Sequence, residues 1–159
     1  MSGPNTASPS PPALFLASQG ISDAPAQAAV AAGYAVLEKF LRAFNARESK
    51  AWSNTLNYPH VRLAGGKVQI WETPEAYAAS NDVEKFAGTG WHHTRWDWVK
   101  PVQADTQKVH FALQFTRFDS DDKPLSSFQA TYVVTLQDGH WGIQARSSYA
   151  GIAWPGAAF

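Results

Sequence analysis

The pattern of hydrophobic and polar positions changes its period several times along the chain, and each change predicts a new element. Asp23 and Pro25, a capping residue and an early proline, precede apolar residues at helical spacing. This pattern predicts a helix over residues 24–45. A second, short helix is expected over residues 47–56, with Trp52 facing inward.

A change to alternating polar and apolar residues follows the second helix. Residues 58–63 and 67–71 alternate with a period of two on either side of a glycine pair, Gly65-Gly66. This spacing and turn chemistry predict a β-hairpin. A third helix is then expected to begin after Thr73, a hydroxyl cap followed by proline, and to end at Gly88.

Four longer segments complete the alternating pattern and predict four strands. Turn-forming residues separate them, as in the Asp-Gly pair at 138–139. We expect these strands to form an antiparallel meander over residues 90–103, 108–119, 126–137 and 141–150.

The two ends of the chain differ from this central domain, which we place at residues 23–150. Residues 1–22 are expected to be a flexible tail, because Ser and Pro dominate its start. The apolar run 13–17 is short for a signal peptide and no Lys or Arg precedes it, so a cytoplasmic location is expected, with secretion as the lesser alternative. Residues 151–159 form an apolar tail that is expected to pack back on the domain or on a second subunit.

Composition narrows the classes of partner. Lys and Arg number 13 and Asp and Glu also number 13, so no net field attracts a polyanion, and nucleic acid is not an expected partner. No apolar run approaches the ~20 residues that span a bilayer. The chain has no cysteine, which excludes disulfides, thiolate metal sites and a cysteine nucleophile. Seven Trp, nine Phe and five Tyr are numerous enough to build a core and to line a pocket.

The densest cluster of candidate chemistry is the segment from Trp91 to Trp98. Strand alternation divides it between two faces of a sheet. One face resembles a pocket wall with a polar tip, and the other resembles a salt-bridged outer surface. The first face would carry His92, Thr94, Trp96 and Trp98, and the second His93, Arg95, Asp97 and Val99.

Three further ionisable residues are candidates for a role in the pocket. His60 lies on the predicted hairpin and suits general acid or base catalysis if it faces the pocket, or a structural or interface role if it does not. Arg117 marks the rim of an apolar strand face or holds a ligand oxygen. Arg146 either clamps a carboxylate or developing oxyanion, or forms an ion pair with Asp97 or Glu72.

Metal and cofactor signatures are missing from the sequence. The five histidines lack the spacing of a metal site, and the chain has no phosphate-binding glycine loop, nucleophile elbow or dinucleotide fingerprint. We therefore expect no cofactor and no metal.

The order of elements and three segments resemble the nuclear transport factor 2-like superfamily, also called the SnoaL-like or ketosteroid-isomerase-like fold. The segments are 40–44, 58–62 and 138–149. The resemblance implies an α+β fold: a cone-shaped barrel of curved, mixed but mainly antiparallel sheet wrapped around three helices of the N-terminal half, as in a cystatin-like roll. It also implies a deep pocket and homodimers through the outer face of the sheet.

The resemblance leaves two functions open. Isomerases of the family use a carboxylate near the end of the first hairpin strand, where this chain has Ala64-Gly65-Gly66 and no acid. The first hypothesis is a cofactor-independent lyase, dehydratase or isomerase acting on an aromatic or polycyclic molecule, with proton transfer by His60 or His92 and charge stabilisation by Arg146. The second is a non-catalytic ligand-binding or dimeric interaction module. The expected ligand-binding residues are Trp52, Tyr58, Trp71, Trp96, Phe115 and Arg117.

Overall fold

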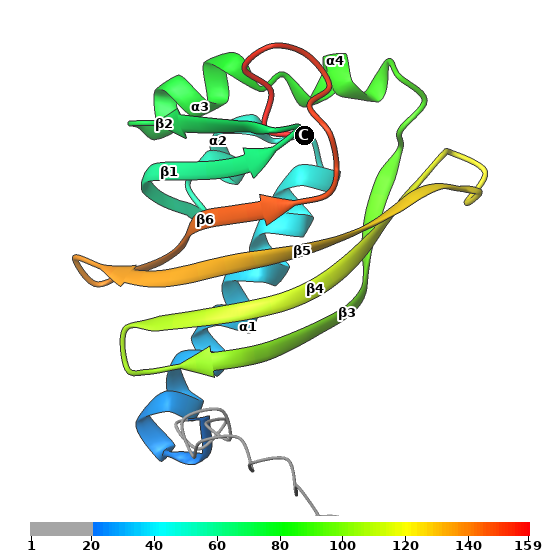
Figure 1. Ribbon diagram of the computed structural model, residues 1–159. Coiled ribbons are helices and arrows are strands. Elements are labelled where there is room, and N and C mark those ends of the chain that lie inside the picture. The colour runs from blue at the N-terminus through cyan, green and yellow to red at the C-terminus, as the bar shows by residue number, and fades with distance from the viewer. Residues whose placement is uncertain (1–20) are drawn as a thin grey trace, which may run out of the picture.

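The computed structural model describes residues 21–159 of the chain. Residues 1–20 lie outside the described residues. They contain the apolar run 13–17 and all but the last two residues of the predicted tail 1–22. The described part is an α+β fold in which the helices cover one face and one end of a curved six-stranded sheet (Figure 1). No helix within it is long and apolar enough to cross a membrane.

The long helix α1, Ala24–Asn45, lies across the concave face of the sheet (Figure 1). The helical spacing is confirmed in part: Leu37, Phe40 and Phe44 are buried, whereas Tyr34 is 38% exposed. The short helix α2, Ser49–Ser53, is shorter than expected and holds Trp52 in the core at 1% exposure. These two helices bring three large aromatic rings to one end of the sheet.

The predicted hairpin consists of β1, Leu56–Ala64, and β2, Lys67–Trp71. Gly65 and Gly66 form its turn with φ angles of +59° and +72°, a left-handed conformation that glycine adopts without strain. His60 and Arg62 are buried on the inner face of β1. The hairpin therefore places two ionisable side chains in the interior.

The predicted third helix is two helices, α3, Pro74–Ser80, and α4, Val83–Ala87. Thr73 caps α3, because its Oγ1 accepts a hydrogen bond from Ala76 N at 3.1 Å. Asp82 provides a second cap, since its Oδ1 accepts from Lys85 N at 3.2 Å. The prediction of one continuous helix was wrong because α3 ends at its C-cap, Asn81, and Asp82 starts another helix.

The remaining strands are β3, His93–Ala104; β4, Lys108–Phe118; β5, Pro124–Gln137; and β6, His140–Ser148. The order in the sheet is β2-β1-β6-β5-β4-β3, with β1 and β6 parallel and the other neighbours antiparallel. This confirms the mixed, mainly antiparallel sheet. The β1–β6 contact also sets Arg62 directly beside Arg146 on the neighbouring strand.

The segment after β6, residues 150–159, folds back toward α3 and α4 (Figure 1, red). Ala157, Ala158 and Phe159 are buried in the hydrophobic core. The apolar tail therefore packs on the body of the same chain, which is the first of the two expected arrangements.

Candidate functional site

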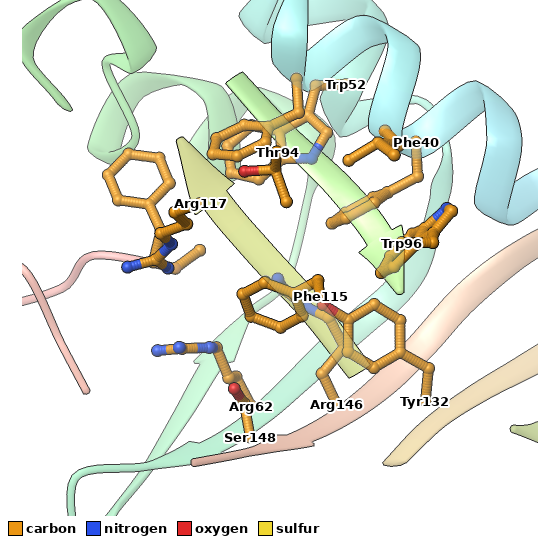
Figure 2. A pocket seen from close by; sticks show the side chains of 14 residues that line it. Phe40, Trp52, Arg62, Thr94, Trp96, Phe115, Arg117, Tyr132, Arg146 and Ser148 are labelled. Carbon is orange, nitrogen blue, oxygen red and sulfur yellow. The ribbon is translucent and has the colours of Figure 1, made fainter. Parts of the chain in front are cut away.

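A small cavity lies between α1 and the inner face of the sheet (Figure 2). Its volume is about 30 Å³, which is room for one or two water molecules. All the strands of the sheet except β2 contribute to it, together with α1, α2 and the segment after β6. The lining residues are Phe40, Leu41, Phe44, Trp52, Arg62, Thr94, Trp96, Phe115, Arg117, Tyr132, Arg146, Ser148, Ala158 and Phe159.

Arg146 is a buried cation of the cavity, with 4% of its surface exposed. Its Nε donates to His60 Nε2 at 3.1 Å, and its Nη2 donates to Tyr77 Oη at 2.9 Å. Burial opposes its charge, but interactions with Tyr77 and Tyr132 outweigh burial and raise the pKa of Arg146 above its usual range. Arg146 therefore remains a guanidinium, fixed in place by neutral groups.

His60 lies behind Arg146 and does not line the cavity. Its Nδ1 is 2.9 Å from the carbonyl oxygen of Ile143. A carbonyl only accepts and a guanidinium only donates, so Nδ1 carries the proton and Nε2 accepts from Arg146. Burial, followed by the charge of Arg146, lowers the pKa of His60 well below its usual value. The imidazole is thus neutral and orients the arginine.

Arg62 is almost fully buried, at 2% exposure. Its Nη2 donates to the carbonyl oxygens of Ala150 at 3.3 Å and Gly151 at 3.1 Å. Its Nη1 has no acceptor among the described residues. Burial and then the charge of Arg146 lower the pKa of Arg62 to about 10, so the side chain is still cationic at neutral pH.

Arg117 packs its guanidinium against aromatic rings. Its Cζ lies 4.9 Å from the ring centroid of Phe86 and 5.2 Å from that of Phe128, and its Nε has no acceptor among the described residues. Burial lowers the pKa of Arg117 to about 10, and the charge of Arg146 contributes in the same direction. Figure 2 shows the guanidinium groups of Arg117 and Arg62 on one side of the pocket and the rings of Trp96 and Tyr132 on the other.

No carboxylate balances these three arginines within the described part of the chain. The described residues form two ion pairs with nitrogen–oxygen distances within 4.0 Å. They join His93 and Arg95 to Asp122 on the outside of the sheet. The unpartnered buried polar atoms of the cavity lining are all N–H donors: Arg62 Nη1, Arg117 Nε, Trp52 Nε1 and Trp96 Nε1. The site is consequently cationic and rich in donors, and most of its other lining residues are aromatic or aliphatic.

Of the residues predicted from the sequence, Trp52, Trp96, Phe115, Arg117 and Arg146 line this cavity. Tyr58 and Trp71 do not; they pack against Tyr77, with ring centroids 6.5 Å and 5.1 Å away. The expected ion pair of Arg146 with Asp97 or Glu72 is absent, because His60 and Tyr77 are its hydrogen-bonding partners.

The predicted pocket wall on β3 is only partly correct. Thr94 and Trp96 line the cavity, whereas His92 is exposed and its Nδ1 lies 2.9 Å from His93 Nδ1. Trp98 is also exposed, at 42%. The pairing of β3 with β4 shifts between Trp96 and Trp98, so a bulge ends the simple alternation on which the prediction depended.

Sequence reasoning did not identify Arg62, Tyr132 and Phe159 as lining residues. The sequence contained one indication for Arg62, because strand alternation places it on the same face as His60. Phe159 had none, since the segment that carries it follows no periodic pattern. Within residues 21–159, no group of three or more histidine or carboxylate side chains is placed to hold a metal ion.

Comparison with known proteins places the chain among proteins of this architecture. Residues 34–150 match the family described as NTF2-like protein (DUF6841). The sequence has no significant match among curated proteins.

Similar solved structures share the fold at low sequence identity. A protein of unknown function with a cystatin-like fold from Nostoc punctiforme aligns with a TM-score of 0.60 and 11% identity, covering 77% of this chain and 90% of its own. A protein of unknown function from Mycobacterium tuberculosis aligns with a TM-score of 0.61 and 14% identity, covering 81% of this chain and 75% of its own. A proposed ketosteroid isomerase from Shewanella frigidimarina aligns with a TM-score of 0.56 and 16% identity, covering 74% of this chain and 94% of its own.

Proposed function

We propose that this chain, which belongs to the NTF2-like protein family (DUF6841), is a small-molecule binding protein whose pocket holds an anion with an apolar body. The observation that carries this proposal is the set of three guanidinium groups in the cavity lining without a carboxylate partner within residues 21–159; those of Arg62 and Arg146 are buried and that of Arg117 is half-buried. Buried charges in proteins are normally paired. A ligand that supplies the negative charge would complete the site.

Repulsion among the arginines supports an anionic ligand. Arg62 and Arg146 stand directly opposite one another on adjacent strands, and the charge of Arg146 lowers the pKa of both Arg62 and Arg117. Like charges in a low-dielectric interior destabilise one another. An oxyanion between them would reverse the sign of that interaction and accept hydrogen bonds from the free Nη1 and Nε atoms.

The rest of the lining supports an apolar body for the ligand. Aromatic side chains form most of the remaining wall, namely Phe40, Phe44, Trp52, Trp96, Phe115, Tyr132 and Phe159. Such walls with a few convergent polar groups are typical of small-molecule sites. The apolar surroundings also strengthen each charged hydrogen bond by excluding water.

Catalysis by proton transfer has less support than binding. Within residues 21–159, the lining contains no histidine, aspartate or glutamate that could act as a base. His60 reaches the cavity only through Arg146, and His92 is on the outside. Arg146 and Tyr132 could stabilise negative charge on a ligand oxygen, so a lyase or isomerase reaction would need a base carried by the ligand.

The proposal is tested by thermal unfolding and calorimetric titration with acetate and benzoate, against chloride at the same ionic strength and against benzamide as a neutral analogue. We expect the carboxylates, and not benzamide, to raise Tm. Arg117→Gln should weaken carboxylate binding by about 10-fold or more, because a hydrogen bond to a charged group contributes ~1.5–3 kcal/mol.

The matched control is Arg95→Gln, which removes a guanidinium paired with Asp122 outside the cavity and should leave the affinity unchanged. Identical Tm values in carboxylate and chloride, or equal affinity of Arg117→Gln and the original protein, would contradict anion binding at this site.

A further inference from the structure

The segment that follows β6, residues 150–159 and called the strap below, forms part of the cavity wall through Phe159. Its ring is stacked on Trp52 at a centroid distance of 5.6 Å and on Phe86 at 4.4 Å, and lies 5.8 Å from Phe44. Three aromatic side chains from different elements thus enclose one phenyl ring. The strap therefore fills this aromatic enclosure with a phenyl ring of the same chain.

The strap also supplies oxygen atoms to one arginine of the cavity lining, Arg62. The carbonyl groups of Ala150 and Gly151 accept both hydrogen bonds that Arg62 Nη2 donates. Phe86, which stacks on the ring of Phe159, also carries the guanidinium of Arg117 over its face at 4.9 Å. The strap therefore places its oxygens against Arg62 and its phenyl ring against Phe86, the ring that also contacts Arg117.

The size of the cavity limits what can bind while the strap is in place. Its volume of about 30 Å³ is far below the ~150 Å³ of a cavity that accepts benzene. A ligand with an aromatic ring can enter only where a side chain of the lining leaves. Among the aromatic residues of the lining, Phe159 is the one that belongs to neither a helix nor a strand.

The strap is attached by side-chain packing and by few hydrogen bonds. Residues 151–159 form no helix or strand, and two of their backbone hydrogen bonds, Ala153 N to Phe159 O and Ala157 N to Trp154 O, stay within the segment. Ala158 N donates to Asn81 Oδ1 at 2.7 Å, and Trp154 Nε1 donates to Ser80 O at 3.4 Å. Apart from these bonds and those that Arg62 donates, the strap is held by the burial of Ala157, Ala158 and Phe159.

We propose that the ligand is a monocyclic aromatic carboxylate that binds by displacing the strap. Its ring takes the place of the Phe159 ring between Trp52 and Phe86, and its carboxylate replaces the two carbonyl groups on Arg62 and reaches Arg117. This inference rests on the proposed anion-binding function and adds the ligand class and the conformational change.

The experiment compares benzoate and acetate binding to three proteins: the original chain, Phe159→Ala and the control Tyr149→Ala. Tyr149 is an aromatic residue beside the strap whose side chain is 84% exposed and outside the cavity. We expect Phe159→Ala to bind benzoate at least 10-fold more tightly, because no ring has to be displaced. Tyr149→Ala should bind benzoate as the original chain does, and acetate should bind all three equally.

A second measurement needs no variant. Hydrogen exchange of the original chain should become several-fold faster at the amides of residues 153, 157 and 158 when benzoate is added, while acetate leaves it unchanged. Equal benzoate affinity of the three proteins, or slower exchange of the strap with benzoate, overturns strap displacement while acetate binding still supports the anion site. Failure of both carboxylates to bind overturns the anion site as well.

Discussion

Arg146 shows at the scale of single residues how a buried charge can be fixed in place without being neutralised. Its partners, His60 and Tyr77, are both neutral, because burial and Arg146 lower the pKa of the imidazole and burial raises the pKa of the phenol above its usual range. Hydrogen bonds orient the guanidinium, and its positive charge is left for a ligand.

Replacing His60 with asparagine should change how stability depends on pH. Below the ordinary pKa of about 6.5, the unfolded chain binds a proton at His60 and the folded chain does not. The free energy of unfolding therefore falls as the pH falls below 6.5, by up to ~1.4 kcal/mol per pH unit. His60→Asn, whose amide can still donate to Ile143 O, should lose this contribution to the slope. Urea unfolding at pH 7.5, 6.5 and 5.5 measures it.

The control for this prediction is His92→Asn, because His92 is exposed on the outer side of the sheet. It should keep the slope of the original chain. If His60→Asn and the original chain lose stability equally between pH 6.5 and 5.5, His60 is not held neutral in the folded protein.

At the scale of elements, the contact between β1 and β6 sets the position of Arg62 relative to Arg146. This parallel pair joins segments far apart in the sequence and aligns Arg62 with Arg146. Gly142 permits the close approach of the two strands: a Cβ there would lie 2.7 Å from Leu56 C and 2.8 Å from Asn57 N. Both are backbone atoms, so no rotation of a side chain could relieve the overlap.

Gly142→Ala should therefore destabilise the protein by about 1–3 kcal/mol, the usual cost of overpacking. Chemical denaturation measures the change. The matched variant Gly151→Ala adds the same methyl group where nothing lies within 4 Å, and it should stay within ~0.5 kcal/mol of the original chain. Equal stabilities of the two variants would show that β6 can move away from β1 without cost.

At the scale of the whole molecule, the predictable parts were those specified by local patterns. The hairpin followed from the alternation around Gly65-Gly66, and the start of α3 followed from Thr73. The break at Asp82 and the bulge after Trp96 depend on one capping bond and one shift of register, which alternation alone does not reveal.

Only part of the candidate site could be predicted from the sequence, for the same reason. Arg117 and Arg146 stood out as charges on strand faces, but the parallel β1–β6 pairing that adds Arg62 is a long-range contact. Phe159 reaches the cavity because a segment without periodicity folds back. Non-local contacts of this kind follow from the assembled fold and not from any window of residues.

The outer face of the hairpin carries the last prediction, a homodimer formed through the sheet. Leu63 pairs with Val68, and Val61 with Ile70, on the face opposite to buried His60 and Arg62. Val68 and Ile70 are 65% and 57% exposed, and neighbouring exposed apolar side chains favour association. Sedimentation equilibrium should detect a dimer, and Ile70→Lys should shift it to monomer at the same protein concentration because a charge would be buried without a partner. The control is Leu125→Lys, a change of the same kind at the start of β5, which should leave the dimer intact. Loss of the dimer in both variants, or a monomeric original chain, would contradict an interface centred on β1 and β2.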